Sequence, residues 1–327
     1  MKAIVYHSYG APSMLQFKEI EKPTAGDNEV HIKVRAASVN PYDWHFMRGT
    51  PYGVRIIAGL RKPKFTGLGA DVAGQIDAVG RNVTQFKVGD EVFGTCRGAF
   101  AEYASASEST VAMKPSNVTF EQAAAVPIAA LTALQGLRDK GHMQPGQKVL
   151  VNGASGGVGT FAVQIAKSFG ADVTGVCSTR NLEMVRSIGA DQVIDYTQED
   201  FTQSGQRYDL ILDAVGNHSL SALKHVLNTN GICVGAGGTT DVWMIAPLTR
   251  AIKSLVISRL GSQKLVGMLA KANTEDLTIL ADLMQSGKVT PVIDKTYSLS
   301  EVPEAIRYLE EGHARGKVVI TSDTAFR

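Results

Sequence analysis

The chain has 327 residues, of which 44% are hydrophobic and 20% are charged, an ordinary globular composition that argues against intrinsic disorder. Because this length exceeds what one hydrophobic core usually organises, we expect two domains. Lysine and arginine outnumber aspartate and glutamate by only 33 to 31 and form no long basic run, so the sequence does not support nucleic-acid binding. Three widely separated cysteines predict neither a disulfide framework nor a metal cluster.

The N-terminal residues have no apolar run of the signal-peptide kind, and no apolar stretch reaches the length of about 18 residues that a membrane span needs. We therefore expect a cytoplasmic protein. Residues 1–122 contain short strands separated by glycine and proline turns, which predicts a β-rich domain. Its strands are expected at residues 3–6, 29–34 and 71–79, with turns at Gly74, Gly80 and Gly89.

From residue 123 onward, apolar strands alternate with helical stretches, a rhythm typical of a parallel α/β sheet. Near-continuous apolar runs suit strands that helices cover on both faces, as in a doubly wound fold. Six strands are expected at residues 148–151, 172–177, 192–194, 209–212, 231–234 and 264–269.

The tail beyond residue 271 predicts two further helices, an extended segment and a last strand. We expect this tail to return to the first domain, so that residues 1–122 and 271–327 form one domain and residues 123–270 form the other. The expected helices lie at residues 276–284 and 302–310, the extended segment at 289–293 and the strand at 317–320.

A glycine-rich turn joins the strand at 148–151 to a helix that should end at Gly170. Bare backbone in this turn lets a pyrophosphate approach the helix N-terminus, where free N–H groups and the helix dipole favour negative charge. Gly159 should let helix and strand pack closely. A tight structural turn is the alternative, and Ala154 replaces the first glycine of the usual pattern. The strand–turn–helix context nevertheless predicts that Ser155, Gly156, Gly157 and Val158 bind a dinucleotide.

The end of the next strand bears on the choice of cofactor. NAD-dependent enzymes usually place an acid there for the ribose 2′-hydroxyl, whereas a 2′-phosphate favours hydroxyls and a cation. This chain has Ser178, Thr179 and Arg180, and no acid before Glu183. An exposed arginine can also be plain solvated surface, but the guanidinium beside two hydroxyls favours NADPH.

These motifs and the β-rich segment before them resemble the medium-chain dehydrogenase/reductase superfamily, and its quinone oxidoreductase branch in particular. The supporting stretches are residues 37–44, 69–74, 89–94 and 189–191. The resemblance implies an α/β protein with a GroES-like β-rich catalytic domain and a Rossmann doubly wound cofactor domain, with the cofactor between them. It also implies a homodimer that pairs through the strand near residues 264–269.

Zinc-dependent relatives in this superfamily carry a metal-binding cysteine where this chain has Asn40, and a Gly-His-Glu motif where it has Gly69-Ala70-Asp71. Their structural zinc lobe has four close cysteines, whereas Cys96 stands alone. Zinc needs about three or four N, S or O ligands, so we expect no metal site. Without this Lewis acid, the reaction that fits best is hydride transfer from NADPH to a quinone or an α,β-unsaturated carbonyl, which needs only a donor for the developing oxyanion.

The resemblance also implies roles for individual residues. Asn40 would orient the substrate or the nicotinamide carboxamide, and Tyr52 would offer its hydroxyl to the substrate oxygen; alternatively, Asn40 caps a helix and Tyr52 only packs. Asp43 is expected to hold this loop from the start of a helix rather than act as a general acid. Further cofactor contacts implied by the family are Thr132, Tyr196, Val215, Gly235 and Lys317. Tyr196 is alternatively a core residue, and Lys317 a solvated one.

Two stretches, residues 52–65 and 243–260, combine apolar with basic side chains. A lid over an apolar substrate pocket or a subunit contact is favoured over a face that rests on an anionic membrane.

Two other functions stay open beside the reductase. One is an NAD(P)-dependent alcohol or aldehyde dehydrogenase, and the other is an NADPH-binding regulatory protein with little turnover.

Overall fold

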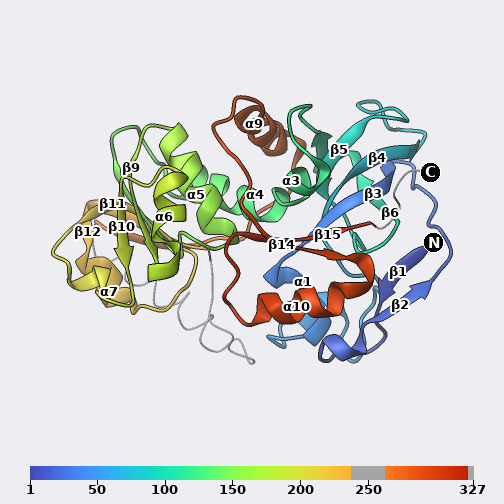
Figure 1. The fold of residues 1–327 in the computed structure, drawn as a ribbon, viewed down its shortest axis with the longest axis horizontal. Helices are drawn as coiled ribbons and strands as arrows, with labels where there is room; N and C mark the ends of the chain where they lie inside the picture. The colour runs from blue at the N-terminus through green and yellow to red at the C-terminus, as the bar shows by residue number, and fades with distance from the viewer. Residues whose placement is uncertain (237–261, 323–327) are drawn as a thin grey trace. The chain divides into compact units, whose positions relative to one another are not determined.

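The computed structural model describes residues 1–236 and 262–322. It divides into two compact units, the first comprising Met1–Ala129, Lys271–Gly287 and Pro291–Arg327, and the second Ala130–Ala270 and Lys288–Thr290. The first boundary falls within helix α4 (Pro127–Gln135). Each unit has its own β-sheet (Figure 1). The predicted stretch 243–260 lies outside the described residues.

The first unit is built on a seven-stranded sheet in the order β14-β15-β3-β4-β5-β7, with β6 paired to β3. A separate pair, β1 and β2, is antiparallel. The strands are β1 Lys2–Val5, β2 Gln16–Glu19, β3 Glu29–Val39, β4 Asp71–Val79, β5 Glu91–Thr95, β6 Tyr103–Ser107, β7 Val111–Met113, β14 Ile293–Ser298 and β15 Lys317–Thr321. The helices are α1 Pro41–Arg48, α2 Val54–Ala58, α3 Phe120–Ala124, α9 Thr274–Gln285 and α10 Val302–Glu310.

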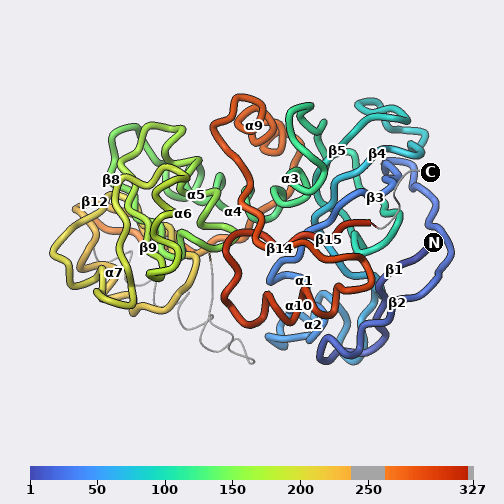
Figure 2. Tube along the Cα trace, in the orientation of Figure 1, coloured from blue at the N-terminus to red at the C-terminus, as the bar shows by residue number. Residues whose placement is uncertain are grey.

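The tail of the chain completes this sheet. β15 pairs antiparallel with β3, so that Val318 lies opposite Val39 and Ile320 opposite Ala37. Figure 2 shows this red segment of the trace beside the blue one, although nearly the whole sequence separates them. Alternate residues of both strands enter one apolar core, which also receives Ile306 from α10. The expected return of the tail to the first sheet is confirmed.

Gly74 was expected at a turn, and this prediction is wrong. It lies inside β4, and a Cβ atom there would stand 2.2 Å from the Lys33 carbonyl oxygen of β3. The register between the two strands also shifts between Val34 and Ala36, next to the Gly74 pair. An isolated glycine in a strand often marks such a close backbone approach or a bulge.

The second unit holds a six-stranded parallel sheet in the order β10-β9-β8-β11-β12-β13, which confirms the predicted doubly wound fold. The chain runs from β8 outward through β9 to β10 and then returns to β11 on the other side of β8. In such sheets, ligands bind at the carboxyl ends of the strands beside this switch point. The strands are β8 Lys148–Asn152, β9 Asp172–Cys177, β10 Gln192–Asp195, β11 Tyr208–Asp213, β12 Leu227–Gly235 and β13 Lys264–Gly267.

Helices of this unit include α5 Gly157–Ser168, α6 Leu182–Ser187 and α7 Leu220–His225. α5 ends where the sequence predicts, with Phe169 as C-cap and Gly170 in the left-handed region at φ 84°. α4 is followed by a π-helical turn, Gly136–Lys140. Among the described helices, none combines the length and the hydropathy needed to cross a bilayer.

Candidate active site

The predicted cofactor residues of the second unit follow strands that end at one edge of its sheet. Asp213, the last residue of β11, lies opposite Asn152 at the end of β8 and Gly235 at the end of β12. On the other side, Asp195 at the end of β10 lies opposite Cys177 at the end of β9. Because the strands are parallel, the loops that follow them gather at this carboxyl edge. The residues that the register brings there are Ser155, Ser178, Tyr196, Val215 and Gly235.

The glycine-rich turn between β8 and α5 leaves no room for a side chain at Gly159. Gly153 has φ 86°, and a Cβ atom on Gly159 would lie 2.0 Å from the Gly153 carbonyl oxygen. Gly159 was expected to let helix and strand pack closely, and the backbone that approaches it belongs to the turn after the strand. Gly156 is the N-cap of α5 and Gly157 its first residue, with no capping side chain from Gly156. This bare helix start fits a pyrophosphate group, which the first-turn N–H groups and the helix dipole favour.

Two asparagines that sequence reasoning missed hold this edge together. Asn181 Nδ2 donates to Ser155 Oγ at 3.1 Å and to Ser178 Oγ at 3.2 Å, which ties the glycine turn to the end of β9. Asn152 Nδ2 donates to Asp213 Oδ1 at 2.9 Å and to Asn217 Oδ1 at 3.0 Å. A polar residue that ends an apolar strand, as Asn152 does, is the signal that would have found this group.

Ser178, Thr179 and Arg180 surround the end of β9. Thr179 Oγ1 donates to Asp195 Oδ2 at 2.5 Å, and this hydrogen bond is the main reason that the pKa of Asp195 lies below its usual range. The carboxylate was not foreseen because it comes from the next strand, β10. Arg180, the residue after Thr179, is exposed. The side chains available for an adenosine 2′-phosphate therefore include an acid as well as a cation.

The other predicted cofactor residues of the second unit differ in exposure. Tyr196 is 60% exposed, so the alternative of a core tyrosine is wrong, and its N–H donates to the Cys177 carbonyl oxygen. Val215 is 43% exposed after β11, whereas Thr132 on α4 is nearly buried. Tyr196 and Val215 thus present side chains to solvent at the carboxyl edge.

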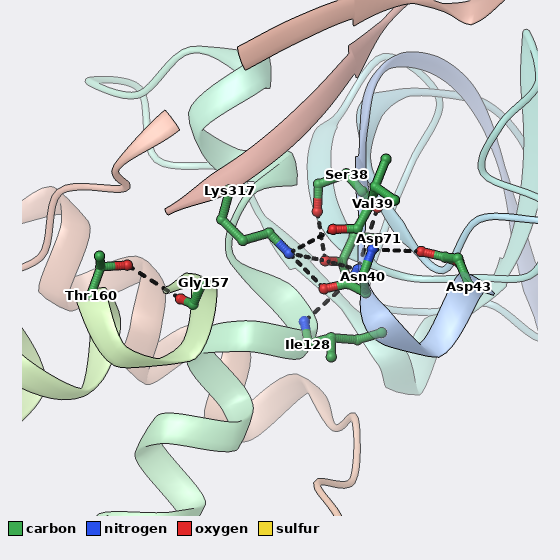
Figure 3. Close-up of polar contacts among 9 residues, drawn as sticks. All are labelled: Ser38, Val39, Asn40, Asp43, Asp71, Ile128, Gly157, Thr160 and Lys317. Carbon is green, nitrogen blue, oxygen red and sulfur yellow. Dashed lines mark hydrogen bonds and ion pairs between the residues drawn. The ribbon is translucent and has the colours of Figure 1, made fainter. Parts of the chain in front are cut away.

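In the first unit, five polar side chains meet in the interior, as Figure 3 shows. Neighbouring strands bring them together, since Ser38 pairs with Asp71 across β3 and β4, and Lys317 opens β15 beside β3. Asn40 is the N-cap of α1, directly after β3. None of the five is more than 3% exposed. The five are Ser38, Asn40, Asp43, Asp71 and Lys317.

Asp71 is the main acceptor of this group. Its Oδ2 atom accepts from Ser38 Oγ and from Asn40 Nδ2, both at 2.8 Å, and lies 3.5 Å from Lys317 Nζ. Its Oδ1 atom accepts from the backbone N–H of Ile128 at 3.0 Å, in the first turn of α4. A buried carboxylate held by this many donors has its hydrogen-bonding capacity met, as burial requires.

Asn40 and Lys317 complete the group. Lys317 Nζ donates to Asn40 Oδ1 at 2.6 Å and to the Val39 carbonyl oxygen at 3.4 Å, while Asn40 Nδ2 also donates to the Ser38 carbonyl oxygen at 3.3 Å. Burial lowers the pKa of Lys317, and the neighbouring Asp71 and Asp43 carboxylates act in the opposite direction. The alternative of a solvated Lys317 is therefore wrong.

Asp43 sits at the start of α1, where its Oδ2 atom accepts the backbone N–H of Asn40 at 2.8 Å. The pKa of Asp43 is raised to about 8, mainly by burial; the nearby Asp71 also raises it, and the Asn40 N–H, Lys317 and the Gly69 N–H offset part of the rise. A carboxyl group in this position is largely protonated near neutral pH. The hydrogen bond to Asn40 still forms, because a neutral carboxyl group keeps an acceptor oxygen.

The residues at the positions of the zinc ligands do not fit a zinc ion. Asn40 directs its oxygen to the Lys317 ammonium and its nitrogen to Asp71, so a cationic side chain already contacts both residues. Within residues 1–236 and 262–322, no three His, Cys, Asp or Glu side chains are grouped so that they could hold a metal ion. Lys317 is the one basic side chain among these five residues.

The segment after α1 carries Tyr52, which is 37% exposed and whose ring lies under the Arg55 guanidinium at 4.7 Å. The residues that follow Tyr52 expose apolar side chains, and hydrogen bonds hold the backbone of this segment in place. Tyr9 Oη donates to the Gly59 carbonyl oxygen, and Lys64 N–H to that of Ala58. The exposed apolar side chains are Ile56, Ile57, Leu60 and Phe65, of which the first three are more than 70% exposed.

Comparison with known proteins agrees with this architecture. Residues 26–116 match the alcohol dehydrogenase GroES-like domain, and residues 188–320 match the zinc-binding dehydrogenase family. The chain is 35% identical to a chloroplast envelope quinone oxidoreductase homolog of Arabidopsis thaliana, over 98% of both chains. It is 36% identical to a 2-methylene-furan-3-one reductase of Solanum lycopersicum, over 98% of this chain and 79% of the relative.

Among solved structures, a quinone oxidoreductase from Coxiella burnetii superimposes with a TM-score of 0.84 at 30% identity, over 98% of this chain and 99% of that one. The chain therefore belongs to the medium-chain dehydrogenase/reductase superfamily, in its quinone oxidoreductase branch, and is an oxidoreductase that uses a nicotinamide cofactor. The predicted family and fold class are confirmed.

Proposed function

We propose that the protein is a zinc-independent, NADPH-dependent reductase that transfers hydride to a quinone or an α,β-unsaturated carbonyl. The observation that carries this proposal is the Lys317 ammonium, held between Asn40 and Asp71 where zinc-dependent relatives bind their metal. The names of the relatives support the same two substrate classes. In this proposal, residues 1–122 and 271–327 are the catalytic domain and residues 123–270 the NADP-binding domain.

The second unit would hold the cofactor, which supplies the hydride when bound. The first turn of α5, with Ser155, Gly156, Gly157 and Val158, presents N–H groups to the pyrophosphate. Ser178 and Arg180 would bind the 2′-phosphate. The residues proposed for the adenosine ribose and the nicotinamide side are Tyr196, Thr132, Val215 and Gly235.

The first unit would supply the substrate side. Asn40 has one amide hydrogen on the long 3.3 Å bond to the Ser38 carbonyl oxygen, so this hydrogen is the one that a carboxamide or substrate oxygen would recruit. The Tyr52 hydroxyl would donate to the substrate oxygen as negative charge develops there. Asp43 holds the backbone of Asn40 in this proposal and transfers no proton.

The exposed apolar side chains of the segment 52–65 would cover an apolar substrate. Leu60→Ser or Ile57→Ser should raise KM for a long-chain quinone several-fold and leave KM for a small, polar quinone nearly unchanged. Co-sedimentation with anionic vesicles tests the competing membrane face. Binding to vesicles that is lost in both variants, with unchanged KM values, would contradict the covering role.

The proposed reaction is tested by following NADPH absorbance with a panel of quinones and 2-alkenals, with NADH in parallel and with a metal chelator present. We expect turnover that prefers NADPH and survives the chelator. Turnover lost to chelator and restored by zinc, together with alcohol oxidation, would make the protein an alcohol dehydrogenase. NADPH binding without turnover on any acceptor would make it a binding protein.

We also propose a homodimer that pairs through β13 in the cytoplasm. β13 is an edge strand of its sheet in the described part of the chain, and Leu269 just after it is 91% exposed. An open strand edge with an exposed leucine favours pairing with a second copy. Light scattering should give twice the chain mass, and Leu269→Lys should lower it toward the monomer value, because a charged side chain at a strand edge opposes edge-to-edge pairing.

A further inference from the structure

The amide of Asn40 has a single orientation that satisfies its neighbours. Lys317 Nζ is a donor only, so the Asn40 atom 2.6 Å from it must be the oxygen. The Asp71 carboxylate is an acceptor only, so the atom 2.8 Å from it must be the nitrogen. A flipped amide would place donor against donor and acceptor against acceptor. The pair of Lys317 and Asp71 therefore acts on Asn40 as a two-point clamp.

Removing the ammonium would release this clamp on one side. Asn40 is 2% exposed, so its oxygen would become a buried acceptor without its partner. Lys317 itself is 3% exposed, and its ammonium contacts Asn40, Asp71 and the Val39 carbonyl oxygen. All three partners belong to the first unit. These contacts favour an action on Asn40 over direct contact with cofactor phosphates, the role that the family resemblance implies.

We propose that Lys317 is a positioning residue, which fixes the orientation of the Asn40 amide so that the amide hydrogen on the long 3.3 Å bond to the Ser38 carbonyl oxygen stays available as the donor for the reacting groups. This inference rests on the proposed reductase function. It adds that the orientation of Asn40 in the free enzyme is set from β15, at the far end of the chain. Lys317 touches neither substrate nor cofactor in this proposal and acts only through Asn40.

The test compares Lys317→Met, Asn40→Ala and the double variant in NADPH-dependent turnover. Lys317→Met should lower kcat on the order of 10- to 100-fold, since small misplacements of a substrate-orienting group cost this much. The NADPH dissociation constant, from quenching of protein fluorescence, should change less than about twofold. A twofold change corresponds to RT ln 2, which is less than a typical hydrogen bond contributes, so a change this small means that no hydrogen bond to NADPH was lost. The double variant should be no slower than Asn40→Ala alone, since Lys317 acts through Asn40.

Lys114→Met is the matched control. Lys114 is also a buried lysine of the first unit, with its side chain 5% exposed, hydrogen bonds to two backbone carbonyl oxygens and an ion pair with Glu91. Its replacement should lower the melting temperature and leave kcat unchanged. Lys317→Gln, whose amide can still donate to the Asn40 oxygen, should recover part of the activity and serves if Lys317→Met does not fold.

Two results would overturn the inference. A raised NADPH dissociation constant with unchanged kcat would show that Lys317 binds cofactor phosphates. The two residues would act independently if adding Lys317→Met to Asn40→Ala lowered kcat by the same factor as Lys317→Met lowers it in the wild-type protein. If the wild-type protein reduces no acceptor, the proposed function is wrong, but hydrogen exchange of the Asn40 side-chain amide still tests the clamp. Equal protection of this amide in wild type and in Lys317→Met would refute it.

Discussion

Replacing Asp43 by asparagine should change how the stability of the fold depends on pH. Asp43 is fully buried, and burial raises its pKa to about 8, against an ordinary value of 3.8. Asparagine has nearly the same shape and keeps an oxygen that can accept the Asn40 N–H. The variant therefore removes a titratable group and leaves the start of α1 intact.

Between the two pKa values, the folded protein holds a proton on Asp43 that the unfolded chain has released. Unfolding then releases a proton, so the wild-type protein loses stability as the pH rises, by about 1.4 kcal/mol per pH unit for one proton. Asparagine has no such dependence. Relative to wild type, the variant should gain about 3 kcal/mol between about pH 5 and about pH 7, and the gain should level off above about pH 8.

The assay is urea unfolding of both proteins at several pH values, followed by circular dichroism. Asp195→Asn is the control, because the hydrogen bond from the Thr179 hydroxyl lowers the pKa of Asp195 below its ordinary value. A lowered pKa affects stability only as the pH falls through the acid range, so this variant should show no slope between about pH 5 and about pH 7. A flat difference between Asp43→Asn and wild type over the same range would show that Asp43 is ionised in the folded protein.

Two further predictions concern the second unit. Arg180→Ala should raise KM for NADPH about tenfold or more, since a charge-assisted hydrogen bond contributes about 1.5–3 kcal/mol. KM for NADH should stay nearly unchanged. Equal effects on both cofactors in steady-state kinetics would contradict the 2′-phosphate role. Gly159→Ala should lower the melting temperature and abolish NADPH binding, because its Cβ would lie 2.0 Å from the Gly153 carbonyl oxygen. Gly267→Ala is the control, because no atom of residues 1–236 and 262–322 lies within 4 Å of the added Cβ, and equal melting temperatures of the two variants would refute the argument.

Much of the second unit could be predicted from the sequence because its signals are local. Runs of apolar residues marked the strands of the parallel sheet, and helical spacing up to Gly170 marked α5. The glycine turn was recognisable because a bare helix start and a close approach at Gly159 both exclude side chains. Gly74 misled the same reasoning, since the contact that requires a glycine there comes from β3, about 40 residues away in the sequence.

The sequence by itself thus determined the fold class, the family and the position of the glycine-rich turn. Only the tertiary structure decided which polar side chains share the interior of the first unit. Lys317 reaches Asn40 across 277 residues, and Asn40 reaches Asp71 across 31. Periodicity and turn chemistry report on neighbours in the chain, whereas the protonation of Asp43 and the orientation of Asn40 depend on burial and on partners that strand pairing brings together.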